Sequence, residues 1–208
     1  MYIPRHFEQS DPAILLEVMQ RYNFATLISA IDGVPTASHV PVLARKRAGV
    51  IHIEGHLAKA NSHWRAFEPE APALIIFHGP HTYISPTLYA PGPHVPTWNY
   101  IAVHASGSVQ VDHSDAAKRS TLEALIAHHE PSYHTQFDQI PPNLRDGMFN
   151  AIVAFDITVS RLEGKFKLGQ HRLGQNRPEM QTSHANGDEQ QRDIARWMER
   201  LGYWSAND

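Results

Sequence analysis

Residues 24–58, FATLISAIDGVPTASHVPVLARKRAGVIHIEGHLA, decide the fold of this chain. Runs rich in β-branched and aromatic residues predict strands over 24–31, 34–44 and 49–56. Asp32 and Gly33 between the first two runs form a dipeptide that adopts the positive φ angles of a tight hairpin. Because the connections are short, the three strands are expected to be antiparallel neighbours.

The flanking segments predict two helices. In SDPAILLEVMQRY, residues 10–22, Ser10 or Asp11 is the expected N-cap and Pro12 the first helical residue. In AKANSHWRAFEP a short helix is expected between Ala58 and Phe67, before Pro69.

Three further strands follow along the chain. Residues 71–79, APALIIFHG, are continuously apolar and predict a strand buried on both faces. Residues 98–112 predict a long strand with a bulge or bend near Gly107, and residues 151–168 predict a final long strand. Between the last two, residues 114–130 predict a helix capped by Ser114.

The C-terminal segment has a different character. Residues 169–191 are polar and interrupted by glycines, which predicts a loop or partial disorder. Behind them, residues 192–204 predict an amphipathic helix that docks on the barrel or on a partner, with one apolar face formed by Ile194, Trp197, Met198 and Leu201.

The order of elements indicates the fold class. Strands outnumber helices, and no alternation of strand and helix predicts a parallel sheet. We therefore expect a mainly β, α+β protein, built as an antiparallel barrel with peripheral helices. At 208 residues, 42% of them hydrophobic, a single domain is the default.

Composition narrows the function classes. The chain has no cysteine, which excludes disulfides and thiolate chemistry, and a net charge of -3 gives no general reason to hold nucleic acid. The 15 histidines are scattered, with His134 expected in a loop, and no HExxH pattern predicts a metal site. No signal peptide or membrane span is apparent, and we expect a cytoplasmic protein.

One candidate site follows the strand that ends at Gly55. His56 precedes a turn, and Lys59 and Asn61 stand at the start of the next predicted helix. Free backbone N–H groups at a helix start, together with a lysine, can bind an anion such as phosphate. The alternative is an ordinary helix start with a solvated lysine.

A second candidate site is YISPTLYAPGPHVPTWNYIAVHASG, residues 83–107. Aromatic rings and hydrogen-bonding side chains together are typical of a pocket for a flat heteroaromatic ligand, and the prolines lower the entropy lost on ordering. The rings belong to Tyr83, Tyr89, Trp98 and Tyr100, and the polar groups to Ser85, Thr97 and Asn99. The alternative is core packing, since Trp98 and Tyr100 share one strand face.

Five ordered blocks give the chain a resemblance to a known family. MYIPRHF, GHLAKANSHW, GPHTYISPTLY, VPTWNYIAVHASG and FKLGQHRLGQNRP resemble the PaiB-type FMN-binding negative transcriptional regulators, from Met1 to Pro178. The resemblance implies a split β-barrel related to the pyridoxamine-phosphate-oxidase flavoproteins. It also implies a homodimer with its flavin sites at the subunit interface. We expect the barrel in residues 1–165 and an appendage in residues 166–208.

The resemblance carries over to named residues. It places the FMN phosphate near His56, Lys59 and Asn61, and the isoalloxazine ring along Ser38, His39 and Val40. Tyr83, Ile84 and Ser85 would support the phosphate or the ribityl chain, and Trp98 and Asn99 would close the pocket from the partner subunit.

Two positions depart from the family pattern. Leu88 stands where the family usually has a tryptophan. The usual Lys-Leu-Ser-Gln-Asn-Arg run is replaced by residues 167–172, and residues 173–177 repeat part of it. Both departures bear on how well a flavin is held.

Three functions are compatible with these observations. The first is an FMN-binding regulator or flavin sensor; direct DNA binding has little support, because the basic clusters 45–47 and Lys165 with Lys167 are small and no helix-turn-helix is apparent. The second is an FMN-dependent oxidoreductase, although no residue stands out as catalytic. The third is a haem-binding or haem-degrading split-barrel protein, with His171 among the candidate axial ligands.

Overall fold

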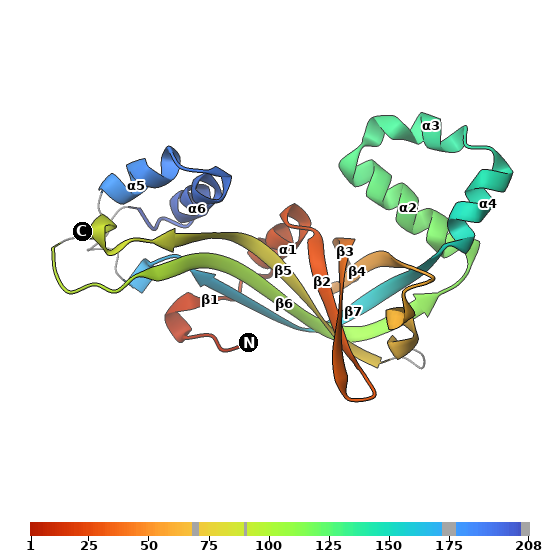
Figure 1. Cartoon of the computed structure of the whole chain (residues 1–208), viewed down its shortest axis with the longest axis horizontal. Coiled ribbons are helices and arrows are strands. Elements are labelled where there is room, and N and C mark those ends of the chain that lie inside the picture. The colour runs from red at the N-terminus through yellow and green to blue at the C-terminus, as the bar shows by residue number, and fades with distance from the viewer. Residues whose placement is uncertain (68–70, 90, 172–177, 205–208) are drawn as a thin grey trace. The chain divides into compact units, whose positions relative to one another are not determined.

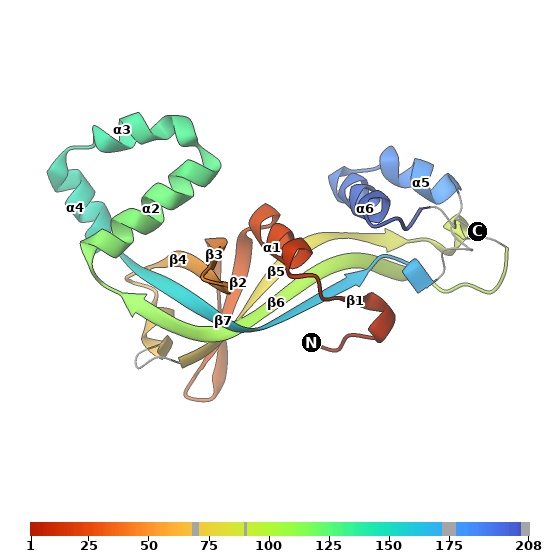
Figure 2. The same cartoon turned by 180° about the vertical axis from the view of Figure 1, so that it is seen from behind.

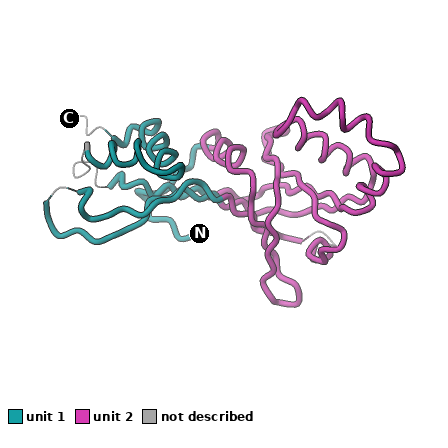
Figure 3. The backbone as a smooth tube through the Cα atoms, turned by 45° about the horizontal axis from the view of Figure 1, so that its top comes forward, with its two compact units in different colours: residues 1–11, 78–103, 163–208 teal, residues 12–77, 104–162 magenta. Residues whose placement is uncertain are grey.

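The computed structural model describes residues 1–67, 71–89, 91–171 and 178–204. The chain forms two compact units (Figure 3). Unit 1 contains residues 1–11, 78–103 and 163–208, and unit 2 contains residues 12–77 and 104–162. Three long strands contribute to both units: β5 (Ala71–Ile84), β6 (Thr97–Asp112) and β7 (Ile152–Lys167). The predicted boundary at residue 165 remains a prediction.

The strands form one mainly antiparallel sheet in the order β1-β7-β4-β3-β2-β5-β6, and a further pairing of β7 with β6 closes it into a ring. β2 (Phe24–Ile31), β3 (Val34–Arg47) and β4 (Val50–Ala58) lie within unit 2. The prediction of a mainly β split barrel with peripheral helices is confirmed.

Two tight turns set the register of β2, β3 and β4. Asp32 and Gly33 have φ angles of 51° and 79°, and Ile31 pairs with Val34. This is the predicted two-residue hairpin. Ala48 and Gly49, with φ angles of 47° and 90°, repeat the same geometry between β3 and β4.

The barrel of unit 2 is filled by inward-facing apolar side chains. Burial alternates along β4 and β6, whereas residues 42–44 of β3 and 153–155 of β7 are buried in succession. The core includes Leu27, Val42, Ile53, Ile75, Phe77, Val109 and Ile157. Helix α1 (Pro12–Arg21), as predicted, starts at Pro12 and buries Leu15, Val18 and Met19.

The expectation that β5 is buried on both faces was wrong, and the bulge or bend expected near Gly107 of β6 stays a prediction. β5 is not buried on both faces: Ile75 and Phe77 are fully buried, whereas Leu74 and Ile76 are partly exposed, because only one side of the strand faces the barrel core. In β6 the alternation of burial continues through Gly107. The glycine is needed because an added Cβ would lie 2.1 Å from the carbonyl oxygen of Thr158.

Helices complete unit 2. A short 3-10 helix, η2 (Ser62–Phe67), occupies the predicted helical segment after β4. Helix α2 (Asp115–His129) begins at the predicted cap, where the Ser114 hydroxyl accepts a hydrogen bond from the Ala117 N–H. Beyond it lie η4 (Pro131–Tyr133), α3 (His134–Asp138) and α4 (Pro142–Asn150). His134 therefore begins a helix and does not lie in a loop.

Unit 1 contains β1 (Glu8–Gln9), which pairs with β7, and the short helices η1 (Arg5–Phe7) and η3 (Pro86–Leu88). Helices α5 (Pro178–Ala185) and α6 (Glu189–Arg200) lie over one face of the unit-1 ends of β5 and β6 (Figures 1 and 2). Helix α6 matches the predicted amphipathic helix, with Ile194, Trp197 and Met198 buried. Helix α5 falls in a segment predicted to be a loop.

No helix in the described part of the chain is long and apolar enough to cross a membrane. The echo of the family run, residues 173–177, and Arg172 lie outside the described residues.

Candidate functional site

A buried histidine organises the polar residues at one end of the β2–β3 hairpin. His63, in η2, is 1% exposed. Its Nε2 lies 2.8 Å from the Ser29 hydroxyl and its Nδ1 lies 2.8 Å from the Ser38 hydroxyl. The Asn61 side-chain amide donates to the Ser38 hydroxyl at 2.9 Å and accepts from the backbone N–H of His63 at 3.0 Å. We call Ser29, Ser38, Asn61 and His63 the serine–histidine cluster.

The hairpin register explains how the two serines meet. Leu27 pairs with Ser38, and Ser29 pairs with Thr36. Ser29 and Ser38 are therefore diagonal neighbours on the inward face of the hairpin. η2 then lies over this face and inserts His63 between them. The sequence predicted Ser38 and Asn61 but missed Ser29 and His63; two polar residues at inward positions of one hairpin were the available signal.

The neighbouring predicted residues lie on different faces of β3. Val40 is buried with Ser38, whereas His39 points outward, where its Nδ1 lies 3.1 Å from the Thr26 hydroxyl. The His39 ring also stacks on exposed Phe24 at a centroid distance of 6.5 Å.

Lys59 lies in the turn between β4 and η2, with its side chain exposed. Its backbone is fixed on both sides: the N–H donates to the Ala151 carbonyl at 2.8 Å, and its carbonyl accepts from the Trp64 indole at 3.0 Å. No ion pair of Lys59 occurs among the described residues. A rigid backbone thus presents a cationic side chain to solvent beside the serine–histidine cluster.

A cavity of about 390 Å³ opens beside the cluster, between the end of the hairpin and η2. One of its lining residues is a cation that the sequence analysis did not predict as part of a site. This is Arg65, whose guanidinium lies over the Trp64 ring at 5.3 Å. The lining residues are Ala30, Ile31, Asp32, Ser62, Arg65 and Ala66.

His56 lies on β4 opposite Ala154 of β7. Its Nδ1 is buried and has no hydrogen-bond partner in the described structure. Burial lowers the pKa of His56, so the imidazole is held in its neutral form. A buried, unpartnered ring nitrogen is costly, and a ligand that supplies a partner would remove that cost.

The remaining predicted residues lie in unit 1 and occupy both faces of its sheet. Tyr83 and Trp98 are about half exposed, 48% and 52%, and their rings meet edge to face at 6.0 Å. Ile84 and Asn99 are buried on the other face. Ser85 caps η3 by accepting from the Thr87 N–H at 3.3 Å.

Asn99 is the most unusual of these residues. It is 1% exposed, and neither its amide nitrogen nor its amide oxygen has a hydrogen-bond partner in the described part of the chain. A side-chain amide normally makes several hydrogen bonds when buried. Asn99 is therefore a residue whose hydrogen bonds a ligand or a second subunit could complete.

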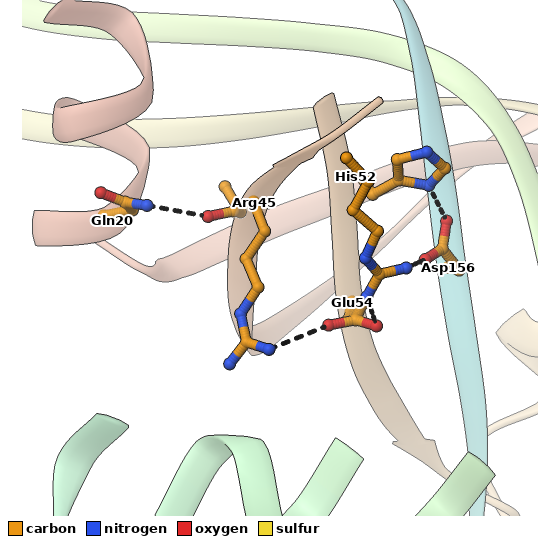
Figure 4. A network of polar contacts seen from close by, with 7 residues as sticks. Gln20, Arg45, His52, Glu54 and Asp156 are labelled. Atoms are coloured by element: carbon orange, nitrogen blue, oxygen red, sulfur yellow. Dashed lines mark hydrogen bonds and ion pairs between the residues drawn. The ribbon is translucent and has the colours of Figure 1, made fainter. Parts of the chain in front are cut away.

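Several cations of the basic clusters considered for nucleic acid contact other groups of the protein. Arg47 of β3 contacts both Glu54 and Asp156, which face each other across β4 and β7 (Figure 4). His52 lies 2.8 Å from Asp156, and Arg45 lies 4.0 Å from Glu54. In unit 1, the Lys165 ammonium lies over the rings of Tyr2 and Tyr100. These cations serve the fold.

Comparisons with known proteins decide the family. The family described as "Putative FMN-binding domain" matches residues 1–161. The chain belongs to this family. The PaiB-like chain is also 34% identical, over 175 residues and 83% of each protein, to the protease synthase and sporulation protein PAI 2 of Bacillus subtilis. It is 29% identical to an uncharacterised protein of Emericella nidulans, over 84% of the chain and 86% of that protein.

Two solved structures with the same fold are a flavocytochrome and a protein that binds FAD and haem. The flavocytochrome Anf3 of Azotobacter vinelandii matches with a TM-score of 0.62 at 14% identity, over 79% of this chain and 72% of that one. The FAD and heme binding protein of Mycobacterium smegmatis matches with a TM-score of 0.59 at 19% identity, over 77% and 73%. At these identities the likeness shows the fold alone. The resemblance to the PaiB-type family and the prediction of FMN as the family's cofactor are confirmed.

The residues present fit such a cofactor. A phosphate monoester needs cations and hydrogen-bond donors, and these are supplied by Lys59 and Asn61 before η2, Arg65 within η2, and Ser38 of β3. Asn99 has polar atoms that a ligand could satisfy, and the Tyr83–Trp98 pair offers an exposed aromatic surface.

Proposed function

We propose that this PaiB-like protein binds FMN as a homodimer in the cytoplasm and acts as a flavin-dependent regulator or sensor. One observation carries the proposal. The serine–histidine cluster joins β2, β3 and η2 by hydrogen bonds, and Lys59 lies in the turn that leads into η2. Arg65 of η2 lines a cavity of about 390 Å³ at the end of the β2–β3 hairpin. Ser38, Lys59 and Asn61 would hold the phosphate, with Arg65 as a further cation.

The other predicted residues take supporting roles in this proposal. His39, Val40 and His56 lie along the strands that would run beside the ring. Trp98 and Asn99 would be supplied across the dimer interface, which would account for the exposed indole and for an amide that has no hydrogen-bond partner among the described residues. Tyr83, Ile84 and Ser85 would support the phosphate or the ribityl chain.

FMN supplies redox chemistry at its ring when bound, and the chain's own residues bind and orient it. We propose regulation through the dimer surface and not through direct DNA contacts. Arg45 and Arg47 are paired with acidic side chains, and Lys165 lies over aromatic rings, so each is already engaged within its own unit.

The oxidoreductase alternative is favoured by the exposed Tyr83–Trp98 pair, a surface on which a planar reductant could stack. Consumption of a nicotinamide reductant by the FMN-loaded protein would support the oxidoreductase alternative. Loss of that turnover in Trp98→Ala would place the reductant at the Tyr83–Trp98 pair. No contact of the described residues specifically favours the haem alternative. The candidate axial ligand His171 packs its ring against the rings of His6 and Phe7, at centroid distances of 5.1 and 5.2 Å.

The test of the proposed phosphate site is Lys59→Ala. Loss of a charge-assisted contact should weaken FMN binding by roughly 1.5 to 3 kcal/mol, measured by titration with flavin fluorescence, while light scattering reports the dimer. Lys46→Ala is the matched control, because Lys46 is an exposed lysine of the same unit outside the site. Equal affinity of the two variants would show that Lys59 does not hold the phosphate.

A further inference from the structure

The His63 imidazole lies between two hydroxyl groups. Nε2 contacts Ser29 and Nδ1 contacts Ser38, both at 2.8 Å, and the ring is almost fully buried. The Ser38 hydroxyl also accepts a hydrogen bond from the Asn61 amide at 2.9 Å. Ser29 contributes to this network from the far side of the ring.

The protons of this network can be counted. A neutral imidazole has one N–H donor and one acceptor nitrogen, so one serine donates to the ring and the other accepts from it. If Ser38 donates to Nδ1, its hydroxyl proton is used. If Nδ1 carries the proton, Ser38 accepts from both Nδ1–H and Asn61, which occupies both its lone pairs. Its own O–H proton is then available to a further group, and Ser29 donates to Nε2.

We propose that Ser29, His63 and Ser38 form a hydrogen-bond relay that presents the Ser38 hydroxyl proton to an anionic oxygen of a phosphate monoester, with His63 as the positioning residue. The inference rests on the proposed function, which places the FMN phosphate at Ser38. The donors in this arrangement are the Ser38 O–H and the second N–H of the Asn61 amide, whose parent atoms lie 2.9 Å apart. Two donors this close together can bind different oxygens of one phosphate group.

The relay couples anion binding to a proton. Protonated His63 donates from both nitrogens, which enforces the same orientation of Ser38 and adds a positive charge. Anion binding and protonation of His63 therefore favour each other. Burial lowers the pKa of His63 in the free protein, and a bound anion would raise it again.

Among the described residues, few charged groups belong to the elements that surround His63. β2 has no charged residue, and His39 of β3 points away from the inward face. The turn and η2 contribute Lys59 and Arg65, and the hairpin tip contributes Asp32. The unmodified protein and a variant at residue 63 share all of these groups, so a pH effect that differs between the two proteins reports on the His63 imidazole.

The decisive variant is Ser29→Ala, which removes the far end of the relay without removing a group that contacts the ligand. We expect it to weaken binding of FMN and of inorganic phosphate about tenfold, the equivalent of one hydrogen bond. Ser160→Ala is the matched control: Ser160 is a strand serine of the same unit that donates to the Ser106 carbonyl, and its loss should leave affinity unchanged.

A second variant tests the coupling to protons. His63→Gln retains one donor and one acceptor but cannot titrate. The ratio of its FMN dissociation constant to that of the unmodified protein should rise as the pH falls from 7.5 to 5.5. The ratio cancels the titration of the FMN phosphate itself, and a constant ratio would overturn the coupling.

The unmodified protein offers a test without any substitution. Nitrogen-15 NMR of the histidine ring should show His63 protonated at Nδ1 when phosphate or FMN is bound. An Nε2–H tautomer in the bound state, or equal affinity of Ser29→Ala and the unmodified protein, would overturn the relay and leave FMN binding standing. Failure of the unmodified protein to bind FMN would instead overturn the proposed function together with the relay.

Discussion

At the scale of single residues, Gly107 of β6 lies against the backbone of β7 within unit 2. A Cβ at this position would lie 2.1 Å from the Thr158 carbonyl oxygen and 2.8 Å from its carbonyl carbon. Both atoms belong to backbone that is held in the sheet, so neither can move aside without breaking strand pairing. The missing side chain is therefore a requirement of barrel closure.

Gly107→Ala should lower the free energy of unfolding by roughly 1 to 3 kcal/mol, the usual cost of overpacking. Gly147→Ala is its control, because nothing lies within 4 Å of a Cβ added there in helix α4. That variant should gain up to about 1 kcal/mol from helix propensity. Urea unfolding of both proteins measures the difference, and equal stabilities would contradict the close approach.

At the scale of elements, helix α6 is fixed at its start by a capping box. The Asp188 carboxylate accepts from the Gln191 N–H at 2.8 Å, and the Gln191 side chain accepts from the Asp188 N–H at 2.9 Å. The helix then packs Trp197 against Phe166 of β7, with ring centroids 5.7 Å apart. Its start and its apolar face are thus stabilised separately.

Asp188→Ala should destabilise α6 by about 1 kcal/mol, while Asp188→Asn keeps a capping oxygen and should lose less. Hydrogen exchange would detect faster exchange at the first amides of α6 in the alanine variant. If both variants exchanged alike, the capping hydrogen bond would have no measurable role.

Elements with a local signal were predictable from the sequence. β2 and its hairpin turn follow from residue types within a few positions, and so do α1 and the Ser114 cap. Helix α5 was missed because PEMQTSHA has no apolar periodicity and follows a polar, glycine-containing run. Partial exposure of β5 was missed because burial depends on which elements cover each face.

The residues of the candidate site also fall into those with a local sequence signal and those without one. Lys59 and Asn61 stand in one short motif, so pattern and family resemblance reached them. Ser29 and His63 were not predicted, because their contacts arise only after β2 pairs with β3 and η2 docks on the hairpin. Local sequence does not encode a contact between residues 34 positions apart.

At the scale of the whole molecule, buried histidines make stability depend on pH. Burial lowers the pKa of His56, His63 and His184; at His184 the Met180 carbonyl and Asp188 oppose this effect. Below about pH 6.5, the ordinary histidine pKa, the unfolded chain binds more protons than the folded one. The free energy of unfolding is therefore not reduced by these histidines above that pH. It decreases as the pH falls from there toward their lowered pKa values.

Urea unfolding between pH 8 and pH 5 should show stability falling below pH 6.5, by at most about 1.4 kcal/mol per pH unit for each of these histidines. His184→Gln should flatten the slope, whereas His81→Gln, at an exposed position of the same unit, should not. A slope unaffected by His184→Gln would mean that this imidazole does not resist protonation in the folded protein.

The contacts of Arg47 have a consequence for how this protein can evolve. Glu54 and Asp156 are like charges placed directly opposite each other, and one guanidinium contacts both. If Arg47 is replaced first, Glu54 and Asp156 face each other without the guanidinium that contacts both. If one of the two acids is replaced first, the other acid keeps its ion pair with Arg47. Positions 47, 54 and 156 should therefore covary among relatives, with an acid replaced before the arginine.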